Sequence, residues 1–259
     1  MPVTQKTDFS PRSSNKEHDR RLEFAKLFEN SPIDKGDLVY SQLSVYLSRQ
    51  ELSRLLVLSD IYRERVVQEN GIMLEFGTCY GRTASLLSNL RGIYEPYNFT
   101  RRRVVFDTFR GLAGVEEKDG SDELAVDGAY SSGEGYENHL EAVLAYHEAE
   151  APIPHIRKFE IIKGNASETC AAYFKNHPEA IVSLAYFDFD IYKPTLDCLQ
   201  TIKRHLAKGS VIVFDQLNCP EYPGETIALG EVASLNKLRV RRSPLTPWMS
   251  YILGEDLLS

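Results

Sequence analysis

The fold class of this chain is decided by residues 72–81, which read IMLEFGTCYG. A mostly apolar run comes first, and two glycines then enclose a short turn. Helical spacing of apolar residues resumes over residues 82–90. A buried strand, a glycine turn and a helix, in this order, open a parallel α/β unit. The sequence therefore predicts a domain in which strands and helices alternate.

Further apolar segments repeat this pattern, and each of them ends on a polar or acidic residue. Strands that are apolar on both faces and alternate with helices indicate a parallel sheet covered on both sides. Residues 238–241 and 248–253 predict a terminal hairpin, which adds an antiparallel last strand. We therefore expect a Rossmann-like α/β fold with a mostly parallel seven-stranded sheet and helices on both faces. The other expected strands are residues 103–106, 159–162, 181–187 and 209–214, and the clearest helices are 136–149, 168–174 and 195–206.

The length of 259 residues suits one large domain, which we expect over residues 21–259. Residues 1–20 are polar and lack periodicity, which is typical of a mobile arm. Residues 21–70 carry helical spacing and predict a helical segment that precedes the sheet. Residues 111–154 form a long acidic stretch with several glycines, which predicts either a lid insertion over the ligand end of the sheet or a solvated loop. We favour the lid.

The composition excludes several classes of protein. Lys and Arg number 30 against 37 Asp and Glu, and this net charge of −7 argues against a dedicated nucleic-acid binder. The basic cluster of residues 101–103 with Arg239, Arg241 and Arg242 is interpreted as a charged surface. No apolar run approaches the roughly 18 residues of a membrane helix, and residues 1–16 do not resemble a signal peptide. The four dispersed cysteines suit a reducing compartment. We expect a cytoplasmic homo-oligomer with a small-molecule partner and neither nucleic acid nor membrane.

The spacing of the glycine turn indicates which cofactor it binds. A G-x-G-x-x-G turn would hold a pyrophosphate, whereas here only Gly77 and Gly81 are present and the acidic Glu75 precedes them. Glu75 would repel a pyrophosphate but can pair with an ammonium group. S-adenosylmethionine fits better, with its ribose at Asp107 and its adenine edge at Asn165. The expected cofactor-binding residues are Glu75, Gly77, Thr78, Tyr80, Gly81, Arg82, Thr83, Asp107, Thr108, Asn165, Ala166 and Asp188.

An acidic pair, Asp188 and Asp190, ends the strand at residues 181–187. Its two carboxylates point to opposite sides of the strand. Asp215 ends the neighbouring strand and could share a Mg²⁺ ion with Asp188, because this ion prefers oxygen ligands. Asp190 could cap the following helix or act as a general base, and the two roles are compatible.

Three blocks of the sequence resemble the macrocin O-methyltransferase family. They are LEFG at residues 74–77 followed by VFDTFRGL at 105–112, then DFDIYKPT at 188–195, then VFDQ at 213–216. The resemblance spans residues 71–230. It implies the class I fold of S-adenosylmethionine-dependent methyltransferases and an activity among Mg²⁺-assisted sugar O-methyltransferases of antibiotic pathways.

The resemblance also implies roles for the acidic residues. Asp188 and Asp215 would be metal ligands, and Asp190 would be the catalytic base that accepts the proton of the substrate hydroxyl. Gln216 departs from the family, because relatives carry a second aspartate there and a glutamine offers only a neutral oxygen. The expected catalytic residues are Asp190 and Asp188, and a metal, where present, would use Asp188, Asp215 and Gln216. Glu225 is expected in the first turn of a helix, with a role as a further oxygen donor as the alternative.

We therefore predict an S-adenosylmethionine-dependent O-methyltransferase that acts on a small molecule, with a sugar hydroxyl of a secondary metabolite as the acceptor. One alternative is a metal-independent N-methyltransferase acting on a small amine. More distant alternatives are an NAD-dependent dehydrogenase and a nucleotide-binding protein without catalytic activity.

Overall fold

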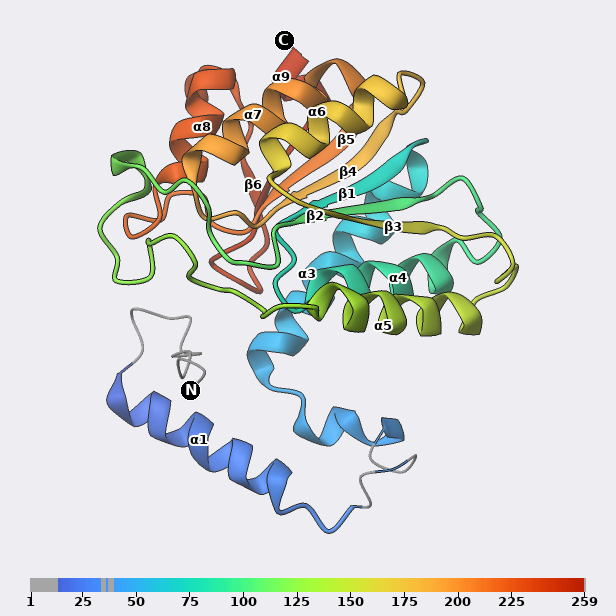
Figure 1. The fold of residues 1–259 in the computed structure, drawn as a ribbon, viewed down its shortest axis with the longest axis vertical. Helices are drawn as coiled ribbons and strands as arrows, with labels where there is room; N and C mark the ends of the chain where they lie inside the picture. Colours follow the sequence, from blue (N-terminus) through green and yellow to red (C-terminus); the bar gives the residue numbers. More distant parts are fainter. Residues whose placement is uncertain (1–13, 34–35, 37–39, 259) are drawn as a thin grey trace. The chain divides into compact units, whose positions relative to one another are not determined.

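The computed structural model describes residues 14–33, 36 and 40–258 (Figure 1). The chain divides into two compact units, with the boundary between Leu52 and Ser53. The sequence predicted a single domain from residue 21, so the observed boundary lies within the segment that we expected to precede the sheet.

The first unit contains helix α1, Asn15–Glu29, which begins earlier than expected. A capping box starts it, because the Ser14 side chain accepts a hydrogen bond from the Glu17 amide and the Glu17 carboxylate accepts one from the Ser14 amide at 2.8 Å. The expected arm over residues 1–20 is therefore helical from Asn15, and residues 1–13 lie outside the described part. A 3₁₀ turn, η1 (Leu43–Tyr46), follows, and the Tyr46 ring packs edge-on against Phe28 at 5.0 Å.

The second unit is built on a seven-stranded sheet with the order β3-β2-β1-β4-β5-β7-β6. The first five strands along the chain are parallel, and β7 runs antiparallel to both β5 and β6. The predicted fold class is confirmed. The strands are β1 (Ile72–Phe76), β2 (Arg103–Asp107), β3 (Phe159–Lys163), β4 (Val182–Phe187), β5 (Leu206–Phe214), β6 (Arg241–Arg242) and β7 (Ser250–Leu253).

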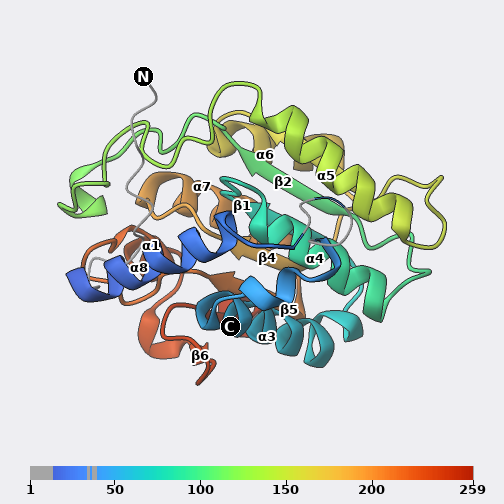
Figure 2. The same cartoon turned by 90° about the horizontal axis from the view of Figure 1, so that it is seen from below.

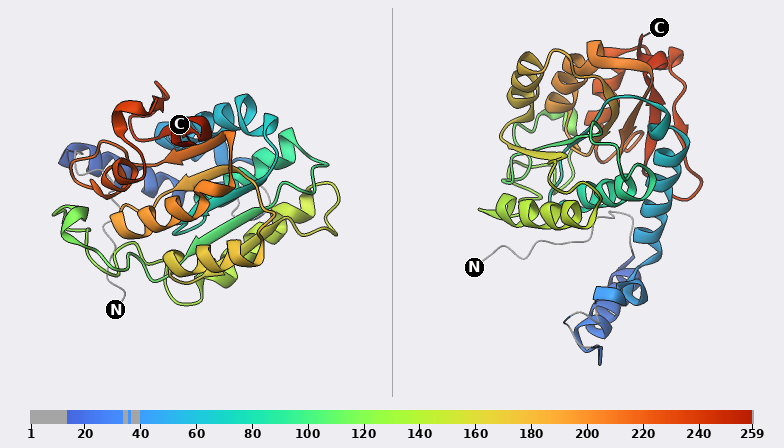
Figure 3. Two further views of the ribbon diagram at one scale, coloured as in Figure 1. Left: turned by 90° about the horizontal axis from the view of Figure 1, so that it is seen from above. Right: turned by 90° about the vertical axis from the view of Figure 1, so that its right-hand side faces the viewer.

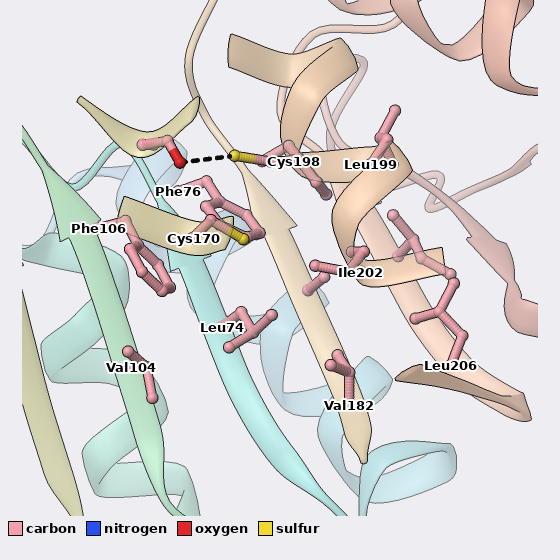
Figure 4. Close-up of a cluster of buried hydrophobic side chains, with 14 of the residues drawn as sticks. Leu74, Phe76, Val104, Phe106, Cys170, Val182, Cys198, Leu199, Ile202 and Leu206 are labelled. Atoms are coloured by element: carbon pink, nitrogen blue, oxygen red, sulfur yellow. Dashed lines mark hydrogen bonds between the residues drawn. The ribbon is translucent and has the colours of Figure 1, made fainter. Parts of the chain in front are cut away.

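Helices α6, α7, α8 and α9 cover one face of this sheet (Figures 1 and 3). They bury a continuous apolar cluster in which the Phe76 ring stacks against Phe106 at 5.2 Å and Phe187 at 4.7 Å. Figure 4 shows this cluster, with the Cys198 thiol donating to the Ala166 carbonyl oxygen at 3.5 Å. These helices are α6 (Ala166–Asn176), α7 (Tyr192–Ile202), α8 (Gly224–Val232) and α9 (Gly254–Leu258).

Helices α3 (Arg49–Glu64), α4 (Arg82–Tyr94) and α5 (Tyr136–Glu150) cover the other face (Figure 2). Leu58 and Tyr62 of α3 pack in one cluster with Met73. Leu140 of α5 packs in another with Val105. Because both faces are buried, the parallel strands carry apolar residues almost continuously, which is the pattern that made them recognisable.

Three expectations differ from the structure. β6 is only two residues long, because the chain before it forms the 3₁₀ turn η5 (Leu235–Lys237) and the Arg241 side chain pairs with Asp256 at 2.5 Å. Helix α5 packs against the sheet, so the irregular part of the expected insertion ends at residue 135. Arg101 and Arg103 are buried rather than part of a charged surface.

None of the helices in the described part of the chain has the length and apolar character that a bilayer crossing requires.

Candidate active site

The ends of β1 and β4 meet where the strand order of the sheet reverses. In open α/β sheets, ligands bind in the crevice outside the carboxyl ends of the strands at such a switch point. The Asp188 amide donates to the Phe76 carbonyl oxygen at 2.8 Å, so the loops after the two strands lie side by side. A Cβ atom added to Gly77, which has φ +81°, would lie 2.1 Å from the Asp188 carbonyl oxygen. The glycine turn after β1 and the loop after β4 that carries the acidic pair are therefore in direct contact.

Strained backbone conformations concentrate at this edge of the sheet. Of six non-glycine residues with positive φ in the described part of the chain, five lie in loops after β1, β2, β4 and β5 or in the part of the insertion before α5. Such conformations are costly, and they cluster where the surrounding structure fixes a side chain for a function. The five are Cys79, Phe109, Tyr130, Asp190 and Asn218, with φ between 49° and 62°.

Asp107, the expected ribose-binding residue, supports the glycine turn. Its Oδ2 atom accepts hydrogen bonds from the amides of Thr78 at 2.6 Å and Cys79 at 2.9 Å. Its Oδ1 atom accepts one from the Phe109 amide at 2.6 Å. The side chain is partly exposed. A carboxylate has about four acceptor sites, so Asp107 retains capacity for a further donor such as a ribose hydroxyl.

Glu75 is fully buried at the end of β1. The Thr78 hydroxyl donates to its Oε1 atom at 2.6 Å, whereas its Oε2 atom has no hydrogen-bond partner among the described residues. Burial raises the pKa of Glu75 to about 7, against the hydrogen bond from Thr78 and the nearby charge of Arg103, which lower it. A buried carboxylate with a free oxygen fits a cationic group, so Glu75 suits the ammonium of S-adenosylmethionine.

The remaining expected cofactor residues lie in the loops that follow β1, β2 and β3 or at the starts of α4 and α6. Gly81 precedes α4 with φ +78°, and the Tyr80 ring meets the Tyr136 ring edge-on at 5.3 Å. The Thr108 hydroxyl closes a local turn by donating to the Gly111 carbonyl oxygen at 2.8 Å. Asn165 caps α6 through the Ser167 amide. Arg82 and Thr83 open α4, and Ala166 is the buried first residue of α6.

Asp190 has the features of a reactive carboxylate. It is buried, adopts φ 62°, and its Oδ1 atom has no hydrogen-bond partner among the described residues. Burial, and then the charges of Asp215 and Asp122, raise its pKa to about 7. Asp188 is only partly exposed, and burial followed by the charges of Asp215 and Asp190 raises its pKa well above its usual range.

The capping role that was considered for Asp190 belongs to another residue. The N-cap position of α7 is Ile191, and the Tyr192 amide donates to Oδ1 of Asp119 at 2.5 Å. Asp119 lies in the turn η3 (Glu117–Asp119) of the insertion, is fully buried, and also accepts from the Glu116 amide at 2.7 Å. Sequence reasoning missed it, because nothing local marks a cap that lies 73 residues away.

The insertion crosses the edge of the sheet above this cluster. The Tyr130 carbonyl oxygen accepts from the Cys79 thiol at 3.5 Å, which joins the insertion to the glycine turn. The hydroxyls of Tyr130 and Tyr222 lie 2.9 Å apart, and the Tyr222 hydroxyl donates to Asp122 at 2.9 Å. The insertion therefore contacts the loops after β1 and β5.

Arg54 of α3 is a second residue that sequence reasoning missed. Its guanidinium donates to the Tyr186 hydroxyl at 2.6 Å and contacts both oxygens of Asp215, at 2.8 and 3.2 Å. The Tyr186 hydroxyl donates to Asp215 Oδ1 at 2.6 Å. Burial alone would raise the pKa of Asp215, but Arg54 and these hydrogen bonds hold it below its ordinary value.

The expected Mg²⁺ site does not fit this arrangement. A guanidinium already occupies both oxygens of Asp215, and its fixed positive charge would repel a divalent cation placed beside them. Within residues 14–33, 36 and 40–258, no group of three or more His, Cys, Asp or Glu side chains is arranged to hold a metal ion. The backbone amide of Gln216 donates to Oε2 of Glu225, and Oε1 of Glu225 accepts from the backbone amide of Phe189. Glu225, in the first turn of α8, thus ties together the loops after β4 and β5.

Comparisons with known proteins place the chain in a family. No protein-family model and no curated protein matches the sequence. The crystal structure of CalS11, a calicheamicin methyltransferase, is similar over 93% of both chains, with 36% identity and a TM-score of 0.89. The chain belongs to the S-adenosylmethionine-dependent O-methyltransferases that include CalS11.

Two further structures agree with this assignment. The apo structure of CalS11, described as a TDP-rhamnose 3′-O-methyltransferase of calicheamicin biosynthesis, is 34% identical with a TM-score of 0.81, over 93% of this chain and 95% of that one. The O-methyltransferase NovP, at 16% identity and a TM-score of 0.57 over 78% and 79% of the two chains, shares the fold. The predicted enzyme class is confirmed, and these relatives lend no support to the dehydrogenase, N-methyltransferase and non-catalytic alternatives.

Proposed function

We propose that this O-methyltransferase transfers the methyl group of S-adenosylmethionine to a sugar hydroxyl of a secondary metabolite, with a nucleotide-linked deoxysugar as the acceptor. The observation that carries the proposal is the buried Asp190 in the loop after β4, which contacts the glycine turn through Asp188, with one oxygen of Asp190 left free for a donor. CalS11, which is described as acting on TDP-rhamnose, supports this class of acceptor.

Bound S-adenosylmethionine supplies an electrophilic methyl group. We propose that Glu75 binds its ammonium, that the backbone at Gly77 allows the close approach of the cofactor, and that Asp107 receives a ribose hydroxyl. Methyl transfer is an in-line displacement, so the protein contributes mainly by holding the two reactants in line. Asp190 accepts the proton of the attacking hydroxyl, which requires hydrogen-bond reach to that oxygen.

The macrocin-type subgroup is part of this proposal. Its support is the block DFDIYKPT at residues 188–195, because this block contains both the free carboxylate of Asp190 and the first turn of α7. The expected second aspartate is replaced by Gln216. The chain would therefore be a member of the subgroup with a modified carboxylate cluster.

Incubation with S-adenosylmethionine and TDP-rhamnose tests the function, with S-adenosylhomocysteine release and the product mass as readouts. We expect transfer of one methyl group to a sugar oxygen. Asp190→Asn should lower kcat by about 10²–10⁴-fold while S-adenosylhomocysteine binding persists. Asp197→Asn is the matched control, because Asp197 lies in α7 and pairs with Lys193 at the surface. Equal activity of the wild type and Asp190→Asn would contradict the assignment of the base.

We also propose that the chain forms a homo-oligomer through its first unit. Helix α1 buries none of its residues in this structure, and its apolar side chains are exposed. Exposed apolar patches mark association surfaces. The side chains concerned are Leu22, Phe24, Leu27 and Phe28. Light scattering of the full chain should give a multiple of 29.4 kDa, and changing these four residues to Ser should give the monomer.

A further inference from the structure

The guanidinium of Arg54 is held in one orientation at the end of β5. Its side chain is 13% exposed, and it contacts Asp215 through both terminal nitrogens. The Tyr186 hydroxyl bonds to the same two residues, so the three side chains form a closed triangle on the α3 face of the sheet. Such a bidentate pair fixes geometry as well as charge.

Negative charge accumulates around this triangle. Asp188 interacts electrostatically with Asp215, Asp190 and Glu225, and all four carboxylates are largely buried. A buried carboxylate is stable only when a cation compensates its charge or when it takes up a proton. Arg54 acts on both Asp188 and Asp215, so it provides such a cation. An arginine side chain remains charged in proteins, so this compensation is permanent.

We propose that Arg54 takes the place of a divalent metal ion in this enzyme and positions the carboxylate cluster for metal-independent methyl transfer. The inference rests on the proposed O-methyl transfer. It explains the departure at Gln216, because a cluster that already holds one monovalent cation needs one carboxylate fewer than a cluster that binds Mg²⁺. Arg54 is a positioning residue here, since its contacts are with Asp215 and Tyr186.

Mn²⁺ binding, followed by electron paramagnetic resonance, tests the inference without any acceptor. We expect no saturable site in the wild type up to millimolar Mn²⁺, with or without S-adenosylhomocysteine. Arg54→Gln should gain a site that binds Mn²⁺ at least about tenfold more tightly, because a repelling charge is removed beside Asp188 and Asp215. Arg63→Gln is the matched control, because Arg63 lies on the same helix, half-exposed, and pairs with Asp60 and Glu64. Stoichiometric Mn²⁺ binding by the wild type would overturn the proposal.

Activity in chelator provides the second readout. The wild type should keep its kcat and KM in EDTA, and added Mg²⁺ should not raise them. Arg54→Gln should lose about 10²-fold in kcat and recover part of it in Mg²⁺. Arg54→Lys keeps the positive charge, so its activity should remain insensitive to chelator. If Arg54→Gln does not fold, the comparison of Arg54→Lys with the wild type tests the inference. Loss of wild-type activity in EDTA and its return with Mg²⁺ would overturn the inference. Failure of the wild type to bind S-adenosylhomocysteine would contradict the proposed function. The Mn²⁺ experiment would still test the role of Arg54, because it does not require the cofactor to bind.

Discussion

The carboxylate of Asp119 accepts a hydrogen bond from the backbone amide of Tyr192 at 2.5 Å, which joins the insertion to the first turn of α7. This contact satisfies a helix-terminal amide that Asp190, two residues earlier, would otherwise be free to cap. Gly224 closes the arrangement, because a Cβ atom there would lie 2.6 Å from Asp119 Oδ1. The conformation of the acidic pair thus depends on a residue of the insertion.

Asp119→Ala should therefore weaken both stability and catalysis. Loss of this acceptor leaves the buried amide of Tyr192 and the part-buried amide of Glu116 without their partner, at a cost of about 1.5–3 kcal/mol in the free energy of unfolding. The kcat should fall, because the loop that carries Asp190 loses its support, while S-adenosylhomocysteine affinity changes little. Thermal unfolding, calorimetry and steady-state kinetics measure the three quantities.

Asp127→Ala is the control for this variant. Asp127 accepts hydrogen bonds from the amides of Gly114 and Val115 within the same insertion, but at an exposed position. Water can replace these bonds, so the loss should stay below about 1 kcal/mol and kcat should be unchanged. Equal losses of stability and kcat in Asp119→Ala and Asp127→Ala would contradict a specific role for Asp119.

Gly77→Ala tests the close approach of the glycine turn to β4. The residue has φ +81°, and the added Cβ atom would lie 2.1 Å from a carbonyl oxygen of Asp188, so the loop must move. We expect a destabilisation of at least about 1–3 kcal/mol and a loss of cofactor binding. Gly92→Ala in α4 is the opposite case, since nothing lies within 4 Å of its Cβ position, and it should stabilise the protein by about 0.5–1 kcal/mol.

The sheet could be predicted from sequence because its signals are local. Each of the parallel strands β1 to β5 contains a short apolar run that is followed by a turn or polar residue, and the chain order of strands and helices then restricts the topology to a few parallel arrangements. The glycine turn and the acidic residues at strand ends were found for the same reason. Residue type and position relative to a strand end were sufficient to identify these residues as candidates for the site.

The contacts that complete the site could not be predicted, because they join distant segments. Arg54 and Asp215 lie 161 positions apart, and Asp119 and Tyr192 lie 73 apart. Neither Arg54 nor Asp119 differs in its local pattern from an exposed charged residue on a helix or loop. The start of α1 was missed for another reason, since its signal is the local pattern SNKE at residues 14–17, which forms the capping box, and not apolar spacing.

Arg101 illustrates the same limit and yields a stability prediction. Its guanidinium is 2% exposed and bonds to Glu95 and to the carbonyl oxygens of Gly71 and Glu69. Arg101→Met would leave the partly buried carboxylate of Glu95 without its cation and the carbonyl oxygens of Gly71 and Glu69 without their donor, with an expected cost of about 3–5 kcal/mol. Arg102→Met should cost less than about 1 kcal/mol, because its pair with Glu160 is exposed. Urea unfolding of both variants measures the difference, and similar midpoints would contradict the structural role.

Glu75 gives a prediction in which stability and cofactor affinity respond to pH in opposite directions. Burial raises its pKa from an ordinary 4.5 to about 7, so the folded protein holds a proton that the unfolded chain has released. The contribution of Glu75 to stability is therefore fully present below pH 4.5 and is lost as the pH rises through 7. The lost contribution is about 3 kcal/mol by the conversion of pKa to free energy. Binding of an ammonium needs the ionised form, so affinity for S-adenosylhomocysteine should rise up to about tenfold per pH unit below pH 7 and level off above it.

Glu75→Gln should remove both dependences, because an amide of the same shape does not titrate in this range. Its stability should change less between pH 5 and pH 8 than that of the wild type, and its affinity for S-adenosylhomocysteine should be low and nearly constant with pH. The variant keeps the oxygen that accepts from Thr78, so the turn should remain intact. Titration calorimetry and thermal unfolding at matched pH values compare the two proteins. A pH dependence of binding that survives in Glu75→Gln would assign the titrating group elsewhere, and the ammonium contact would then be wrong.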